Sequence, residues 1–139
     1  MSQGEQGRRI VQNHRDLEVY RMAFEAAMMI FNLSRKFPVE ERYSLTDQIR
    51  RSSRAVCANL AEAWRRRRYE GSFLLRLNDS EAEAAETQAW LEFALECGYL
   101  QADELRKLYE RYDHIIGKLV TMINNPSSWL MTGNNSRDK

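Results

Sequence analysis

Proline and glycine are scarce in this 139-residue sequence, which contains two prolines and six glycines. Because these two residues most often interrupt regular structure, long unbroken elements are expected. No stretch approaches the roughly 20 consecutive apolar residues that span a bilayer. The polar stretch Met1–Asn13 also lacks the apolar run of a signal peptide. The sequence therefore predicts a soluble, cytoplasmic protein without a membrane partner.

An excess of charge of one sign is also missing. The 21 lysines and arginines are balanced by 20 aspartates and glutamates, for a formal net charge of +1. Any attraction to nucleic acid must therefore come from a local patch. The two cysteines, Cys57 and Cys97, show no CxxC spacing and lie in apolar helical stretches. We interpret them as buried thiols of a reducing compartment, and a disulfide between them stays open as an alternative.

Four segments have the apolar spacing of helices, over about 13–36, 44–68, 73–97 and 102–124. Asn13 is the expected N-cap of the first helix, and Pro38 ends it. Ser44 with Asp47 resembles a capping box at the start of the second helix. A Gly71-Ser72 turn precedes the third, and Gly98 is placed to end it in the left-handed conformation.

The expected core consists of apolar stripes at helical spacing. In the second helix the stripe is Leu45, Ile49, Val56, Leu60 and Ala63; in the third it is Phe73, Leu77, Ala84, Leu91 and Leu95; in the fourth it is Leu105, Leu108, Tyr112, Ile115, Leu119 and Met122. The first helix has two adjacent stripes, which are Leu17, Tyr20, Phe24, Ala27 and Phe31, and Val19, Met22, Ala26, Met29 and Leu33. A helix with two apolar stripes needs cover on more than one side, from deep burial or from another subunit.

The fold class that follows is all-α, an antiparallel up-down-up-down four-helix bundle. The connections after the second and third helices are short, so consecutive helices are expected to pack antiparallel. We expect one domain over residues 1–139, with an ordered core at about 13–124 and polar tails at 1–12 and 125–139.

Catalytic chemistry has little support in the sequence. His14 and His114 are the only histidines, and neither belongs to a Glu-x-x-His pair of the kind that holds metals in helical bundles. Glycine-rich phosphate loops and nucleophile elbows are absent. Ser52, Ser53 and Ser80 have no evident base beside them. We predict no enzyme, no cofactor and no metal, with a small-molecule or metal-binding enzyme as the weakest alternative.

Charge is segregated between the second and third helices. Seven arginines and one acid, Glu62, lie between Arg50 and Arg68, whereas six acids and no base lie between Asp79 and Glu96. On a helical wheel, Arg50, Arg54, Arg65 and Arg68 fall within about 60° and could follow a phosphate backbone. The candidate nucleic-acid-binding residues are Arg50, Arg54, Arg65, Arg66 and Arg68. The alternative is structural: pairing with acids of the third helix, and cations at a helix C-terminus.

A second face of the same helix is polar, with Gln48, Arg51, Asn59 and Glu62 at three- and four-residue steps around Ala55. Of these, Gln48, Asn59 and Glu62 are candidate interface residues. They could hydrogen-bond to a neighbouring helix or mark a seam between subunits. A solvated face explains the same pattern equally well.

The sequence also contains the motif Phe37-Pro38-x-Glu40-x-x-Tyr43-x-Leu45-x-x-Gln48-Ile49-Arg50-Arg51, followed by Asn59-x-Ala61-Glu62. It is flanked by Asp16-Leu17-x-Val19-Tyr20 and by Glu86-Thr87-x-x-Trp90-Leu91-x-x-Ala94-x-x-x-Gly98-Tyr99-Leu100. Over about residues 16–123, this pattern resembles the bacterial four-helix-bundle family named for intervening sequences of 23S ribosomal RNA genes.

The resemblance implies a four-helix bundle and a ring-like homopentamer. It also implies a relation to the accessory variability proteins of diversity-generating retroelements, which are basic pentamers that bind nucleic acid and a reverse transcriptase. This sequence departs from the pattern at Ala63, where many members have glycine, and in its net charge of +1. The resulting hypothesis is a non-enzymatic oligomer that binds RNA or DNA, with a reverse transcriptase as a candidate partner. The alternative is a protein-interaction or assembly scaffold without a nucleic-acid role.

Overall fold

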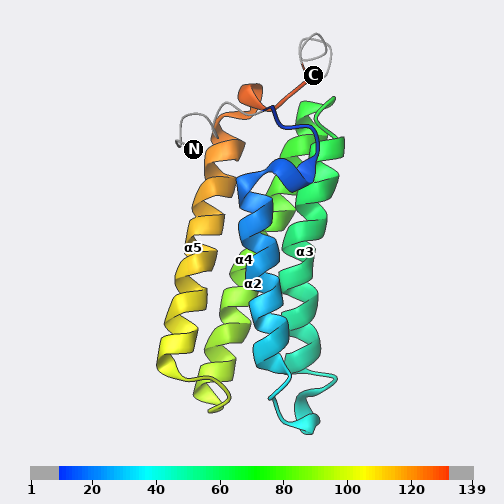
Figure 1. Cartoon of the computed structure of the whole chain (residues 1–139). Helices are drawn as coiled ribbons and strands as arrows, with labels where there is room; N and C mark the ends of the chain where they lie inside the picture. Colours follow the sequence, from blue (N-terminus) through cyan, green and yellow to red (C-terminus); the bar gives the residue numbers. More distant parts are fainter. Residues whose placement is uncertain (1–9, 132–139) are drawn as a thin grey trace.

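The computed structural model describes residues 10–131, and four long α-helices make up most of them (Figure 1). They are α2 (Glu18–Ser34), α3 (Leu45–Arg65), α4 (Glu70–Glu96) and α5 (Ala102–Asn124). Three short 3-10 helices accompany them: η1 (His14–Asp16), η2 (Val39–Glu41) and η3 (Pro126–Ser128). No strand occurs within residues 10–131, so the all-helical prediction with four helices is confirmed.

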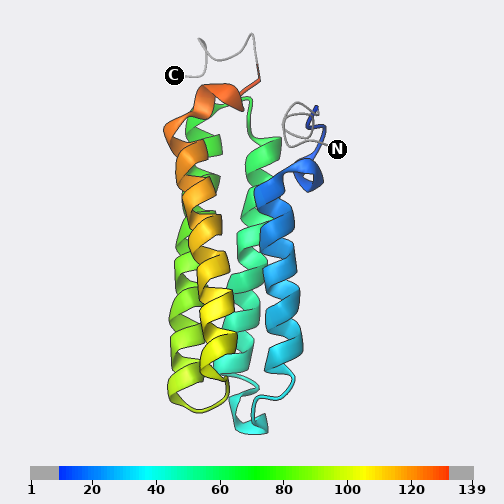
Figure 2. The ribbon, with the colours of Figure 1, turned by 60° about the vertical axis from the view of Figure 1, so that its left-hand side comes forward.

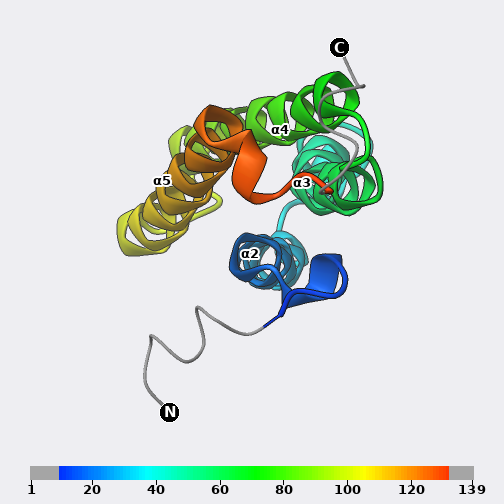
Figure 3. The same ribbon diagram turned by 90° about the horizontal axis from the view of Figure 1, so that it is seen from above.

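The helices lie side by side along one long axis. Figure 1 shows α2 leading away from the end that holds η1, and α3 leading back toward it. Figure 2 shows the same alternation for α4 and α5. Contacts between α3 and α4 follow this pattern, since Ser52 meets Thr87 whereas the later Asn59 meets the earlier Arg76. Seen from above, α4 lies between α3 and α5, and α2 lies beside α3 (Figure 3).

Of the five predicted core stripes, the three of α3, α4 and α5 point inward. All five stripe residues of α3 are buried, and so are Phe73, Leu77, Ala84 and Leu91 of α4. In α5 the stripe is buried from Leu108 to Met122. Leu95 and Leu105, at the adjoining ends of α4 and α5, are only half-buried. The periodicity identified the core well in α3 and α5, whose opposite faces are polar, and also in α4, although α4 exposes Leu75 and Phe93 as well.

The core face of α2 differs from the predicted stripes. Its buried residues are Val19, Ala23, Ala26, Ile30 and Ser34, whereas Phe24 is 50% exposed. The two alanines have no exposed surface, and their small side chains allow the backbone of α2 to approach its neighbours closely. Because apolar residues occur all round this helix, periodicity alone could not select the face that turns inward.

The first helix is also shorter than the predicted 13–36. Asn13 accepts a hydrogen bond from the Arg15 N–H on its Oδ1 at 2.9 Å, and therefore caps the short η1 instead of α2. Leu17 is extended, with a ψ of 129°, and this residue separates η1 from α2. The Leu17 side chain is buried in the core, although the residue lies outside α2.

The predicted Ser44–Asp47 capping box is wrong. The Ser44 hydroxyl donates instead to Glu41 Oε1 at 2.7 Å, and the same oxygen accepts the Leu45 N–H at 3.2 Å. Glu41 therefore satisfies an N–H of the first turn that lacks an intrahelical partner.

At its other end α3 stops at Arg65, three residues before the predicted Arg68. The turn between α3 and α4 therefore lies between Arg65 and Glu70. Gly71 and Ser72, predicted as the turn, belong instead to the first turn of α4.

Gly98 ends α4 as predicted. Its φ is +83°, the only positive φ recorded in the described residues. The Gly98 N–H donates to Leu95 O and the Tyr99 N–H to Ala94 O, both at 2.9 Å. This pair of bonds is the Schellman motif, which satisfies carbonyls that the helix leaves free. The residue before it, Cys97, is exposed, which corrects the prediction of a buried thiol. Cys57 is buried, and burial raises its pKa to about 12.

Two glycine substitutions are expected to change stability in opposite directions. Gly98→Ala should lower the free energy of unfolding by about 1 kcal/mol, because a Cβ disfavours the left-handed conformation. Gly117→Ala should raise it by about 0.5–1 kcal/mol, because Gly117 lies within α5, has an ordinary φ and has open space around its Cα. Urea denaturation of both variants against the wild type measures the two shifts, and a gain from Gly98→Ala would contradict the assignment.

The ordered structure extends beyond the predicted limit at residue 124. After α5 the chain forms η3, Leu130 is buried, and Trp129 packs against the core. The Met131 N–H donates to Arg67 O at 3.3 Å, which ties this segment to the turn between α3 and α4. The two apolar side chains cover the end of the helices, so this part of the predicted polar tail is structural. Residues 1–9 and 132–139 of the predicted tails lie outside the described residues.

Candidate nucleic-acid interface

The arginines of α3 form two groups at opposite ends of the helix. Arg50 and Arg54 lie in its first half, and Arg65 is its last residue. Arg66 and Arg68 lie in the turn that follows. The predicted alignment of Arg68 with Arg50 assumed a helix through residue 68, so it does not hold. The candidate residues therefore form two separate basic groups in place of one continuous line.

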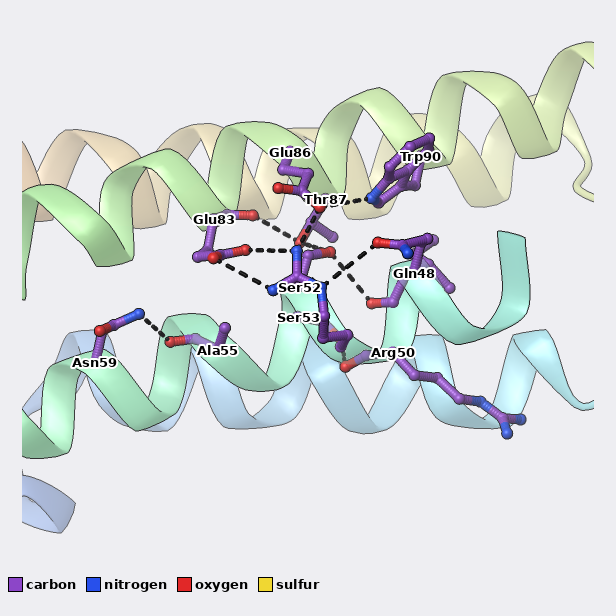
Figure 4. A network of polar contacts seen from close by, with 12 residues as sticks. Gln48, Arg50, Ser52, Ser53, Ala55, Asn59, Glu83, Glu86, Thr87 and Trp90 are labelled. Carbon is purple, nitrogen blue, oxygen red and sulfur yellow. Dashed lines mark hydrogen bonds and ion pairs between the residues drawn. The ribbon is translucent and has the colours of Figure 1, made fainter. Parts of the chain in front are cut away.

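Arg50 connects α3 to α2. Its Nε donates to Ser34 Oγ at 2.8 Å and its Nη2 to Phe31 O at 3.4 Å, and its guanidinium lies 4.8 Å from the centre of the Phe31 ring. All of these partners are uncharged, so the positive charge is not neutralised. Burial, with the nearby charges of Arg54 and Arg35, lowers the pKa of Arg50. Figure 4 shows its side chain directed away from Glu83 and Glu86.

Arg51 faces the opposite way and is neutralised. Its Nη2 lies 3.1 Å from Glu83 and 2.5 Å from Glu86 of α4. Glu86 also accepts the indole N–H of Trp90 at 3.1 Å. Hydrogen bonds from Arg51 to these two carboxylates raise its pKa. The structural alternative, pairing between α3 and α4, therefore accounts for Arg51.

Arg54 lies on the exposed side of α3 and makes no ion pair within residues 10–131. It lines a hollow of ≈ 490 Å³ at the start of α3, together with Arg42, Thr46, Asp47, Arg50 and Arg51. A second hollow of ≈ 350 Å³ shares Arg42, Thr46 and Arg50, and adds Arg35 from the end of α2. Arg35 and Arg42 were missed in the sequence, because neither lies on the α3 periodicity that revealed the other arginines.

Glu41 holds the loop that presents Arg42. Its carboxylate accepts the Ser44 hydroxyl at 2.7 Å on Oε1 and the Tyr99 hydroxyl at 2.8 Å on Oε2. Hydrogen bonds from Ser44, Tyr99 and the Leu45 N–H lower the pKa of Glu41. This acid is therefore engaged with neutral donors, and no ion pair joins it to Arg42 in the described structure.

The group at the far end of α3 is partly engaged. Arg66 lies 3.9 Å from Glu62 and donates to Ser72 Oγ at 3.2 Å. Arg67 lies 3.5 Å above the centre of the Trp64 ring and donates to Trp64 O at 2.7 Å. Trp64 is itself buried. Arg65 and Arg68 are exposed, and no ion pair involves them in the part of the chain that the structure describes.

The second polar face of α3 contacts α4 within the same subunit. Asn59 accepts from Arg76 Nη1 at 3.1 Å and donates to Ala55 O at 3.0 Å. Glu62 lies 3.4 Å from the same Arg76. Gln48 contacts Arg51 at 3.5 Å, a long separation for a hydrogen bond. Figure 4 shows Asn59 directed toward Ala55.

The serines raised as candidate nucleophiles are buried and make structural hydrogen bonds. Ser52 contacts the Thr87 hydroxyl, and Ser80 donates to Val56 O, both at 2.8 Å. Across residues 10–131, no group of three or more His, Cys, Asp or Glu side chains is arranged to hold a metal ion. No helix in the same range has the length and apolar character that a bilayer crossing requires.

Comparison with known proteins agrees with the helical arrangement and the α3 motif. The model of the 23S rRNA-intervening sequence protein family matches residues 15–121. The chain belongs to this family. The resemblance based on the motif around Gln48-Ile49-Arg50-Arg51 is thereby confirmed.

A solved structure from Bacteroides thetaiotaomicron is similar to this family member. It is a protein of unknown function from the S23 ribosomal protein family, with 27% identity and a TM-score of 0.69. The match covers 76% of this chain and 95% of that one. The search of curated proteins found no match. Neither the family nor the solved relative indicates a catalytic activity.

Proposed function

We propose that this protein is a non-enzymatic oligomer that binds RNA or DNA through arginines of α3 and the turn after it. The observation behind the proposal is the charge left on Arg54, Arg65 and Arg68, which are exposed and form no ion pair within the described residues. Exposed guanidinium groups make charge-assisted, often bidentate contacts with phosphate. Arg50 and Arg66 lie beside them, although both have intramolecular contacts.

The acids of α4 do not neutralise these arginines. Glu83 and Glu86 bind Arg51, and Glu92 accepts the Tyr109 hydroxyl at 3.0 Å. Ion pairs between α3 and α4 therefore explain only part of the charge segregation along the sequence. The unneutralised arginines favour a polyanionic partner over a purely structural role.

The oligomer is supported by the outer face of α2. Phe24 and Met28 are 50% and 45% exposed, and Tyr20, Ala27 and Phe31 beside them are only half-buried. An apolar face of this kind is typical of an interaction surface. We propose that it packs between copies of an up-down-up-down antiparallel bundle, in the ring-like homopentamer that the resemblance implies. A ring would repeat each arginine group around its circumference and raise the avidity for a long polyanion.

The same face of α2 also favours the second candidate function, an assembly scaffold without a nucleic-acid role. In that case a protein would cover the apolar side chains, and a reverse transcriptase is the partner that the resemblance suggests. The arginines would then serve solubility or a protein contact. The two functions predict different responses to salt and to nucleic acid.

Fluorescence anisotropy with the purified protein tests the proposal on structured RNA, single-stranded DNA and duplex DNA. Binding is expected at low salt and at about 150 mM, with log K falling linearly in log salt by about 0.7–0.9 for each phosphate contacted. The salt slope therefore counts contacts and can be compared with the arginines available. Affinity that does not change with salt, or no binding at low salt, would contradict the proposal and favour the scaffold.

A further inference from the structure

The two hollows at the start of α3 gather arginines from three parts of the chain. Arg35 comes from the end of α2, Arg42 from the loop after η2, and Arg50 and Arg54 from α3. The hollows adjoin through Arg42, Thr46 and Arg50, which line both of them. Four guanidinium groups from three segments of the chain therefore surround one concave region.

This concave region is poorly neutralised. Asp47 is the only acid that lines either hollow, and it makes no ion pair within residues 10–131. Arg51 also lines the larger hollow, but Glu83 and Glu86 of α4 compensate its charge. Burial lowers the pKa of Arg50, and the positive charges of Arg54 and Arg35, which face it across the hollows, lower that pKa further. An anion bound among them would relieve this repulsion.

Thr46 adds an independent polar group that has no assigned partner. Thr46 is only 9% exposed and lines both hollows. Its hydroxyl makes no hydrogen bond within the described part of the molecule. The hydroxyl faces the hollow, so it is free to donate a hydrogen bond to a bound ligand. Thr46 also lies in the first turn of α3, where the helix dipole favours negative charge. A hydroxyl that can donate at the edge of a cationic hollow suits the same anionic ligand as the arginines.

We propose that this region binds a terminal phosphate, the monoester dianion at the end of an RNA or DNA strand. The inference rests on the proposed function for the strand and adds the chemical group that is recognised. A monoester offers three oxygens and close to two negative charges near neutral pH, more than an internal diester. It therefore fits a site where several guanidinium groups and a hydroxyl converge better than a single carboxylate does.

Tyr43 supplies a surface for the nucleotide that bears the phosphate. Its side chain is 85% exposed, and the Arg42 guanidinium lies 5.9 Å from the centre of its ring. An exposed aromatic ring can stack on a base of any identity. A terminal phosphate in the hollow would place the first base within the neighbourhood of Arg42, so Tyr43 is expected to contribute to strand binding and not to binding of inorganic phosphate.

The test uses the full-length protein and short single-stranded oligonucleotides of one sequence. Each bears a 5′-phosphate, a 3′-phosphate or only hydroxyl ends, and the dye sits at the end opposite the phosphate. Anisotropy is measured for the wild type, Arg42→Ala, Thr46→Val and Tyr43→Ala. Arg106→Ala is the matched control, because Arg106 is exposed on α5 and makes no ion pair in the described structure. Circular dichroism melting checks that each variant is folded.

A phosphorylated end is expected to raise wild-type affinity by about tenfold or more, as one charge-assisted contact would. Arg42→Ala and Thr46→Val should remove this gain while binding of the hydroxyl-ended strand stays nearly unchanged. Inorganic phosphate should compete with the phosphorylated strand. Tyr43→Ala should weaken binding of the strand without changing the affinity for inorganic phosphate. Arg106→Ala should preserve the gain.

Equal affinity for phosphorylated and hydroxyl-ended strands would overturn this inference and leave the proposed function intact. Binding of inorganic phosphate without binding of any strand would overturn the proposed function and the strand end as the source of the phosphate. Displacement of the strand by an acidic peptide that outcompetes phosphate would show that the hollow recognises a protein carboxylate, and would overturn the phosphate assignment.

Discussion

Replacing Arg54, Arg65 and Arg68 together by alanine is expected to lower nucleic-acid affinity by on the order of a hundredfold at low salt and to reduce the salt slope by about 2–3. These three side chains are exposed and form no ion pair in the described residues. Their removal therefore leaves no buried acid without its partner. Stability should therefore change little, because surface substitutions of this kind usually lie within about 0.5 kcal/mol. Anisotropy titrations at several salt concentrations give both quantities.

A matched loss of charge separates local recognition from overall charge. Arg65→Ala with Arg68→Ala removes two positive charges at the end of α3, and Arg106→Ala with Lys107→Ala removes two exposed charges from α5. The α3 pair should weaken binding much more than the α5 pair. An equal loss for both pairs would mean that binding responds only to net charge. No loss for either pair would make the α3 arginines irrelevant to nucleic acid.

Introducing aspartate at Phe24 and Met28 together is expected to convert the proposed oligomer to a monomer of about the chain mass, 16.4 kDa. Both side chains are about half exposed in the single subunit, so the fold should tolerate the change. At an interface between subunits the same positions would bury two carboxylates without partners, which is strongly unfavourable. Light scattering coupled to size exclusion reports the mass, and circular dichroism should show a nearly unchanged melting temperature.

The control for this surface is Leu75→Asp, on α4, where an equally exposed apolar residue lies outside the α2 face. It should leave the oligomer intact. A monomeric wild type, or an oligomer that survives both substitutions in α2, would show that this face does not join subunits. If the monomeric variant still binds nucleic acid with a smaller apparent affinity, the difference measures the avidity of the assembly.

Several features of the fold follow from local sequence signals. The stripes of α3 and α5 identified their buried faces, because each of these helices has a polar face opposite the apolar one. Gly98 identified the end of α4, because a left-handed residue is rarely anything else. The motif around Gln48 and Arg51 identified the family across most of the chain. These signals act over a few residues, so they can be recognised without knowledge of the tertiary structure.

The inward face of α2 required the packed structure. Apolar residues surround this helix, and the burial of Ala23 and Ala26, which have no exposed surface, shows which face turns inward. The start of α3 also depends on tertiary contacts. Glu41 Oε1 caps the Leu45 N–H, and Glu41 Oε2 accepts a hydrogen bond from the Tyr99 hydroxyl, which comes from after α4. The Glu41 cap spans only four residues, but the inward face of α2 and the bond from Tyr99 to Glu41 depend on residues that are distant along the chain, so a short window of sequence does not reveal them.

The state of each arginine was likewise decided by tertiary contacts. Arg50 and Arg51 are neighbours in the sequence, but successive helical residues point about 100° apart. One consequently reaches Ser34 and Phe31 of α2 and keeps its charge, whereas the other reaches Glu83 and Glu86 of α4 and is neutralised. The sequence by itself determined that arginines would crowd this helix. Only the packing of α2 and α4 on either side decided which of them remain available to bind an anion.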